Sequence, residues 1–235
     1  MIEAYIANKR KYYEGEQTGE YLKLPAAEED VKALLMSIGV DGVLYREISI
    51  LYYMSDVEGL DRILGGHESI DELNYLATVL SGMDSREIYK FEATLEYGEH
   101  TSSVKELINL ALNQDCYDLN PDVAGDEELG VYNAGLFGAV SVPETLEHYI
   151  DYESYGRDIA SNENGKHTAN GYIRKNTTDI GERYCGKDDI PKACRIFSYP
   201  DLPDKMRIRQ QLEMYGNMTD PAKAGRQHAR TREAR

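Results

Sequence analysis

Along the first 53 residues, the spacing of apolar side chains predicts two strands, a helix and a third strand. Residues 3–8 and 19–24 alternate as short strands on either side of a polar turn at residues 14–16. A helix follows, whose apolar residues recur at helical spacing: Val31, Leu34, Leu35 and Ile38. Residues 48–52 alternate again as a strand, so residues 1–53 are expected to form a small ββαβ module.

Three helix start signals mark the middle of the chain. In each, a capping residue is followed three positions later by a glutamate, which is the pattern of a capping box: Ser69 with Glu72, Asp84 with Glu87, and Ser103 with Glu106. We therefore expect these glutamates to act as caps. With a shorter helix at residues 56–64, the pattern predicts a small helical bundle over residues 54–113.

The remainder of the chain has a weaker pattern, interrupted by Gly and Pro. The expected elements are a strand and turn at 114–122, one or two helical turns at 126–133, a flexible joint at 135–138, a helix that begins at Pro143 and runs towards Asp158, and a strand at 171–175. Pro191, Pro200 and Pro203 indicate irregular structure. Together these elements predict an α/β module over residues 114–200, followed by a basic, partly disordered tail over residues 201–235.

The predicted fold class is α+β: an elongated chain of three small domains, namely the ββαβ-like module, the helical bundle and the α/β module, with an irregular basic C-terminal extension. Composition agrees with this prediction, because the chain has 19 Tyr but only three Phe and no Trp. Tyrosine covers apolar surface while its hydroxyl stays in water, which suits thin modules better than one thick core.

Other features of the composition indicate a cytoplasmic protein. Three cysteines without C-x-x-C spacing support neither a disulfide framework nor a zinc ribbon. The first residues lack the pattern of a signal peptide, and no run of eighteen apolar residues occurs, so no association with a membrane is expected.

Charge is distributed unevenly along the chain. Residues 1–160 contain 32 Asp and Glu against 11 Lys and Arg, whereas residues 161–235 contain 10 against 15. The 51 residues 106–156 contain no Lys or Arg at all, but they carry eleven carboxylates: Glu106, Asp115, Asp118, Asp122, Asp126, Glu127, Glu128, Glu144, Glu147, Asp151 and Glu153. Since a folded domain is better served by interspersed charges, this segment suggests a surface selected for binding.

A search for catalytic and metal-binding motifs gives little. The chain has no glycine-rich phosphate loop, no nucleophile elbow and no H-E-x-x-H, and its five histidines are scattered singly. Asp118, Asn120 and Asp122 have the spacing that begins a calcium loop, but Val123 and Leu129 stand where that loop needs Gly and Glu. We therefore expect no cofactor, no metal and no catalytic residue. A carboxylate hydrolase is a third possibility, because 42 acids make suitably spaced pairs easy to find.

The excess of acid is better explained by a basic partner. Duplex DNA presents one negative charge per about 1.7 Å of axis, and DNA-binding proteins carry basic grooves that match this density. Short helices and turns that expose carboxylates every few residues can imitate the phosphates and attract such a groove. A DNA mimic built this way needs thin modules joined lengthwise, in agreement with the predicted fold.

One segment of the chain resembles a known family. Residues 142–159, VPETLEHYIDYESYGRDI, are similar to the antirestriction motif of the ArdA antirestriction proteins. The matching residues, in the same order, are Pro143-Glu144, Tyr149, Asp151-Tyr152-Glu153 and Gly156-Arg157-Asp158. Residues 4–25, 69–75 and 103–117 resemble the same family, so the likeness covers about residues 1–175.

This resemblance implies a dimer of three-domain protomers that mimics bent B-form DNA and occupies the DNA-binding groove of type I restriction-modification enzymes. It implies an inhibitor without catalysis, whose acidic body does not bind DNA directly. The dimer contact would lie near the motif, at Pro143, Tyr149, Asp151, Tyr152, Glu153, Tyr155, Gly156, Arg157 and Asp158. Arg157 would then pair with a carboxylate such as Asp158, Asp151 or an acid of the partner protomer.

The chain also departs from the family pattern. Residues 131–140, VYNAGLFGAV, stand where other members have an acidic helix, and two glycines lower the helix propensity there. The basic tail is likewise unusual in a mimic of DNA. The alternative function is that of an acidic adaptor that binds a basic protein other than a restriction enzyme.

Overall fold

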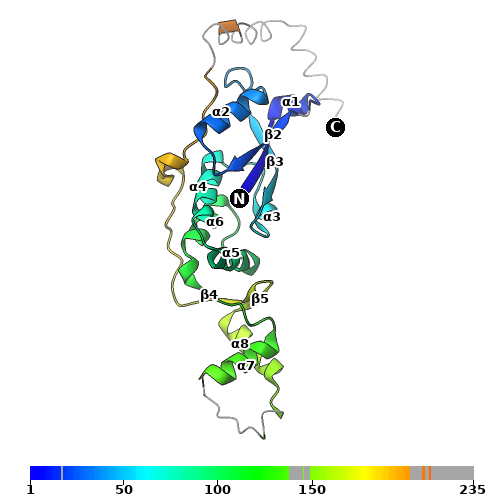
Figure 1. Ribbon diagram of the computed structural model, residues 1–235, viewed down its shortest axis with the longest axis vertical. Helices are drawn as coiled ribbons and strands as arrows, with labels where there is room; N and C mark the ends of the chain where they lie inside the picture. Colours follow the sequence, from blue (N-terminus) through cyan, green and yellow to red (C-terminus); the bar gives the residue numbers. More distant parts are fainter. Residues whose placement is uncertain (17, 138–144, 146–148, 202–207, 210–211, 213–235) are drawn as a thin grey trace, which may run out of the picture.

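The described part of the chain forms an elongated molecule (Figure 1). The computed structural model describes residues 1–16, 18–137, 145, 149–201, 208–209 and 212. Within them it shows a mixed α+β fold with eight α-helices and two small antiparallel sheets. One sheet lies towards one end, helices α4, α5 and α6 lie in the middle, and the second sheet leads to helices α7 and α8 at the other end (Figure 1).

The first sheet has the strand order β2-β1-β3, with β1 central and antiparallel to both neighbours. Its strands are β1 (Ile2–Asn8), β2 (Gly19–Leu24) and β3 (Ile48–Ser55). Helix α2 (Glu28–Ser37) packs on one face through the apolar positions that the periodicity indicates. The predicted strands and helix are confirmed, but the turn before β2 contains helix α1 (Lys9–Tyr13), which the sequence pattern does not reveal. The Asn8 side chain caps this helix by accepting a hydrogen bond from the Lys11 backbone N–H.

The middle of the chain is helical, as predicted. It contains α3 (Leu60–Ile63), α4 (Ile70–Ser81), α5 (Ser85–Tyr97) and α6 (Val104–Leu112). The capping box of α5 is confirmed, because Asp84 accepts from the N–H groups of the first turn while Glu87 accepts from the Asp84 N–H. The prediction is wrong for Glu72, which instead accepts a hydrogen bond of 2.8 Å from the Tyr184 hydroxyl.

The second sheet has the order β4-β6-β5 and is also antiparallel. It consists of β4 (Tyr117–Asn120), β5 (Lys166–Thr168) and β6 (Gly171–Lys175). Helices α7 (Asp126–Phe137) and α8 (Tyr152–Glu163) lie between β4 and β5 in the sequence. One prediction fails here, because helix α7 continues through Gly135 to Phe137, within the stretch expected to form a flexible joint. Helix α8 begins after Asp151 and extends beyond Asp158. The helix start expected at Pro143 lies outside the described residues and stays a prediction.

Residues 176–201, which we call the C-terminal strap, run back along the helices towards the first sheet. The strap contains only two short 3-10 helices, η3 (Lys187–Asp189) and η4 (Lys192–Cys194), as its prolines indicate. Its backbone is held by buried side chains of the central helices. The Asn109 side chain accepts from the N–H groups of Arg183 and Tyr184 and donates to the Tyr184 carbonyl at 2.8 Å.

The strap also supplies part of the hydrophobic core. Tyr184, Ile190, Cys194 and Ile196 are buried in the same cluster that contains the cores of the first sheet and of the helices. At its end, the Tyr199 hydroxyl donates to the Arg46 carbonyl at 2.9 Å, next to the first sheet. One continuous core therefore extends from β1 to the second sheet. In the described part of the chain, no helix has the length and apolar composition needed to cross a membrane.

Candidate partner-binding surface

Helices α7 and α8 cross so closely that their backbones touch. A Cβ atom on Gly156 would lie 1.8 Å from the Asp126 carbonyl oxygen, and a Cβ on Gly130 would lie 2.0 Å from the Tyr152 carbonyl oxygen. Only glycine fits at either point. The crossing sits over a small core of Val123, Leu129 and Tyr172, separate from the main one. Close backbone contact thus holds the part of the chain that carries most of the acidic segment and its motif.

The acidic segment has counter-ions in space, although it has none along the sequence before Arg157. Arg183 of the strap lies 3.4 Å from Asp115, and Arg174 of β6 lies 3.5 Å from Asp118. Both arginines follow the segment in the chain and return to it through the fold. The sequence alone suggests a surface without counter-ions, but in the folded chain Asp115 and Asp118 each have an arginine nearby.

Arg157 neutralises two further carboxylates. Its guanidinium lies 2.6 Å from Glu153 and 3.4 Å from Asp126, which also has His167 at 2.8 Å. The prediction that Arg157 pairs with carboxylates is confirmed, but the partners are Glu153 and Asp126 rather than Asp158 or Asp151. Because Arg157 and Glu153 are largely exposed, their pair contributes little to stability and chiefly fixes the position of the arginine.

The remaining acids of the segment divide into caps and exposed groups. Glu106 accepts a hydrogen bond of 2.8 Å from the Ser102 N–H at the start of α6, so its role as a cap is confirmed. Asp122, Glu127 and Glu128 are exposed and make no ion pair within the described residues. Glu144 and Glu147 lie outside the described residues. Among the described acids of the segment, Asp122, Glu127 and Glu128 thus face solvent with their charge uncompensated.

Asp151 caps helix α8. Its carboxylate accepts hydrogen bonds from the Ser154 backbone N–H at 2.9 Å and from the Ser154 hydroxyl at 2.8 Å. These bonds favour the charged form and lower the pKa of Asp151 below its ordinary value. The cap therefore stabilises α8 at a pH above the pKa of an unfolded Asp, about 3.9, and this contribution is lost as the pH falls through the lower folded value.

We expect the start of α8 to fray at neutral pH in the variant Asp151→Ala, because the Ser154 N–H in the first turn loses the carboxylate that accepts its hydrogen bond. Hydrogen exchange of the Ser154 amide should become faster than in the wild type at pH 7, and the difference should shrink only as the pH falls through the lowered pKa of the folded Asp151, below about 3.9. The neighbouring variant Glu153→Ala, which leaves the cap in place, is the control. Equal exchange in both variants would show that Asp151 does not hold the helix end.

The other motif residues lie partly on the surface. Tyr149 is 85% exposed and Tyr155 is 43% exposed, while helix α7 exposes Val131 and Tyr132. Tyr152 is half-buried, and Asp158 is exposed. Gly156 differs from the rest of the motif, since it is buried at the helix crossing. The dimer contact predicted for this motif stays a prediction.

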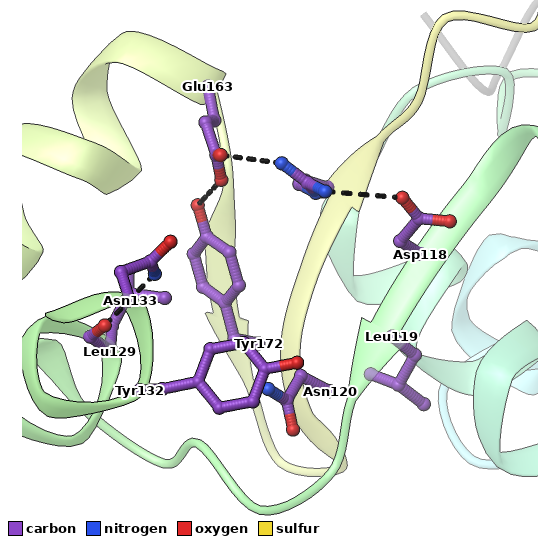
Figure 2. A pocket seen from close by; sticks show the side chains of 9 residues that line it. Asp118, Leu119, Asn120, Leu129, Tyr132, Asn133, Glu163 and Tyr172 are labelled. Atoms are coloured by element: carbon purple, nitrogen blue, oxygen red, sulfur yellow. Dashed lines mark hydrogen bonds and ion pairs between the residues drawn. The ribbon is translucent and has the colours of Figure 1, made fainter. Parts of the chain in front are cut away.

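A small hollow beside β6 collects several polar side chains, as Figure 2 shows for Asp118, Glu163 and Tyr172. Its volume is about 240 Å³. Arg174 bonds to both Glu163 and Asp118, and the Tyr172 hydroxyl donates to Glu163 at 3.2 Å. Burial raises the pKa of Tyr172, so its hydroxyl stays protonated. These groups satisfy one another and form a structural network at the junction of sheet and helix.

The arginines that return to the acidic segment could not have been identified from its own composition. Arg174 and Asp118 face each other because β4 and β6 pair in antiparallel register. The only signal in the sequence is that bases reappear after residue 160. Among the described residues, no group of three His, Cys, Asp or Glu side chains could hold a metal ion.

Comparison with known proteins identifies the family. No curated protein matches the chain. The family model of the antirestriction protein ArdA matches residues 4–174, which includes both sheets and all eight helices of the described structure but ends before the C-terminal strap. A match over this much of the sequence shows that the chain belongs to the ArdA antirestriction protein family.

Proposed function

We propose that this antirestriction protein acts as a mimic of DNA: an acidic, elongated homodimer that occupies the DNA-binding groove of a type I restriction-modification enzyme in the cytoplasm. It competes with DNA and does not bind DNA itself, and it catalyses no reaction. Family membership supports the antirestriction function. The mechanism and the target rest on the charge and shape of the chain.

The observation that carries the proposal is that uncompensated carboxylates occur along the whole molecule. Several exposed acids make no ion pair within the described residues. They include Glu29 on α2 and Asp61 on α3, near the first sheet, and Asp122, Glu127 and Glu128 at the opposite end of the molecule. The elements that carry them follow the long axis (Figure 1). A series of charges on a narrow body resembles a phosphate backbone more than it resembles a catalytic site.

Such a surface would act at long range and by competition. A basic groove with low-dielectric walls focuses its field, so it draws an acidic body of matching shape and raises the rate of association. Binding then releases the ions condensed around each partner. An inhibitor that blocks the methyltransferase core would suppress modification and cleavage together, whereas one that matches only the motor subunits would leave methylation intact.

Dimerisation would lengthen the imitation of DNA. Tyr149 and Tyr155, together with Val131 and Tyr132 of α7, are exposed and supply apolar surface for a contact between two protomers. A contact here would join the ends of two molecules and place the exposed acids of α7 near the centre of one long curved surface. In this proposal each protomer consists of three domains, over residues 1–53, 54–113 and 114–200.

A titration tests the proposal. The purified protein is added to a type I methyltransferase that holds its labelled target duplex, and bound DNA is followed by fluorescence anisotropy. We expect the duplex to be displaced, and the affinity of the protein for the enzyme to fall steeply as salt rises, as it does for DNA. Duplex that stays bound at a large excess of protein in low salt would exclude this target, and capture of a different basic protein would support the adaptor function.

Charge variants separate the exposed acids from the paired ones. We expect the double variant Glu127→Gln, Glu128→Gln to bind the enzyme more weakly. A plot of the logarithm of the binding constant against the logarithm of the salt concentration should also become shallower, by less than about one unit of slope for each charge removed. The matched control, Asp115→Asn with Asp118→Asn, changes net charge equally but removes acids that Arg183 and Arg174 already neutralise. A single acid whose loss abolishes function would instead indicate catalysis.

A further inference from the structure

The outer face of the first sheet carries a row of three tyrosines. The register places Tyr21 of β2 and Tyr52 of β3 on either side of Tyr5 in the central strand. The rings of Tyr5 and Tyr52 are stacked, with centroids 4.6 Å apart and an angle of 7° between their planes. Tyr21 meets them edge-on at 5.0 Å and 5.7 Å. We call these three side chains the tyrosine row.

The tyrosine row is held in a fixed arrangement. A Cβ atom on Gly19 would lie 2.5 Å from the Tyr5 ring, so the glycine leaves the space that this ring fills. The Tyr21 and Tyr52 hydroxyls share a hydrogen bond of 3.2 Å, and this pairing with Tyr21 raises the pKa of Tyr52 to about 12. Tyr52 therefore stays neutral at physiological pH. Because the rings are already fixed against one another, little side-chain entropy remains to be lost on binding.

The row lies on an open surface. Tyr21 and Tyr52 are 39% and 46% exposed, and Leu51 and Met54 beside them are exposed to the same extent. The row borders a groove of about 420 Å³ that Tyr12 of α1 also lines. In the part of the chain that the structure describes, helix α2 and the main core cover only the opposite face. A contiguous apolar patch of this kind usually marks a binding surface.

The chemistry of the patch selects a guanidinium group. The faces of aromatic rings carry negative charge density, and arginine stacks on them while it keeps its charge. The same part of the molecule shows contacts of a cation with a tyrosine ring, because the Arg10 guanidinium lies 5.3 Å and the Lys11 ammonium 5.7 Å from the centroid of the Tyr45 ring. Of the two, only the planar guanidinium can also stack flat on a ring. The surrounding 160 residues carry 32 acids against 11 bases, which repel a nucleic acid and attract a cation.

We propose that the tyrosine row binds arginine side chains of the basic protein that this chain inhibits. The inference rests on the proposed function for the source of those arginines, since a groove that contacts phosphates is rich in them. In this arrangement the carboxylates replace phosphates, and the tyrosines replace the stacked bases as flat surfaces beside the charge. The row adds a contribution to binding that depends weakly on salt.

The first experiment measures affinity for the methyltransferase as a function of salt, with the full-length chain. We expect Tyr21→Ser with Tyr52→Ser to weaken binding about tenfold at every salt concentration, because two ring contacts are lost while net charge is unchanged. Tyr21→Phe with Tyr52→Phe keeps the rings and should bind as the wild type does. Tyr89→Ser, at an exposed tyrosine on α5, is the matched control and should have no effect. Thermal unfolding of each variant confirms that the fold is retained.

Equal affinity of the serine variant and the wild type for the enzyme would overturn the inference, and so would a loss that appears only as a shallower salt dependence. A second measurement does not depend on the enzyme. Labelled peptides of alternating Gly and Arg, or Gly and Lys, have the same charge. We expect the wild type to prefer the arginine peptide and the serine variant to lose that preference. A wild type without the preference would contradict the inference. So would a wild type whose tyrosine row is already filled by the chain's own arginine-rich residues 226–235. Peptide preference without binding to the enzyme would refute the proposed target alone.

Discussion

Replacing Gly156 by alanine is expected to separate helices α7 and α8. The new methyl group would lie 1.8 Å from the Asp126 carbonyl oxygen and 2.8 Å from the Gly130 nitrogen. Both contacts are with backbone atoms, so no side chain can rotate to relieve them. Overpacking of a well-packed site costs roughly 1–3 kcal/mol, and a clash between two backbones lies at or above the upper end of that range. The second core, around Leu129 and Tyr172, should then lose its cover.

Hydrogen exchange followed by mass spectrometry measures this effect by segment. Peptides from α7 and α8 should lose protection in Gly156→Ala, while peptides from α4 and α6 should keep it, because those helices belong to the main core. If the antirestriction motif acts through this pair of helices, the variant should also lose its inhibition of restriction. Full protection of α8 in the variant would show that the crossing is looser than the structure indicates.

Gly135 provides the control on the same helix. Nothing lies within 4 Å of a Cβ atom built there, and α7 is helical on both sides of it. Since alanine favours a helix over glycine by about 1 kcal/mol, Gly135→Ala should stabilise α7 by up to that amount. The two substitutions are chemically identical, so opposite effects on stability would assign the difference to the helix crossing alone.

The regular elements could be predicted because their signals are local. Apolar spacing and the capping box of Asp84 and Glu87 locate α5 without reference to any other part of the chain. Gly135 shows the limit of such signals. Its low helix propensity predicts a break, but packing of α7 against α8 outweighs about 1 kcal/mol of propensity.

The C-terminal strap and the counter-ions could not be predicted, because both depend on contacts between distant residues. The strap has no periodicity, and its place along the helices is fixed by side chains such as Asn74, whose Nδ2 donates to the Cys194 carbonyl 120 residues later. An Asn in the interior of a helix does not by itself predict a hydrogen bond to a distant segment of the chain. Arg174 similarly reaches Asp118 only once β6 has paired with β4.

Replacing Asn109 by alanine is expected to release the strap from helix α6. The side chain is only 8% exposed and makes hydrogen bonds of 2.8 Å, 2.9 Å and 2.8 Å with the Arg183 N–H, the Tyr184 N–H and the Tyr184 carbonyl. Each buried group left without a partner costs about 1–3 kcal/mol. Three such groups imply a loss of at most about 3–9 kcal/mol in the free energy of unfolding, reduced because the Arg183 N–H is only partly buried and by whatever water enters the site.

Denaturant unfolding gives the total loss, and exchange of the Arg183 and Tyr184 amides gives its location. Asn133→Ala is the control, because the Asn133 side chain makes only a local bond of 3.0 Å to the Leu129 carbonyl within α7 and should cost less than about 1.5 kcal/mol. Retained protection of both strap amides in Asn109→Ala would mean that burial of Tyr184 and the other side-chain bonds to the strap, such as that of Asn74, hold it without Asn109. Loss of protection there, with α5 still protected, would show that Asn109 is needed to join this segment, which lies beyond the family match, to helix α6.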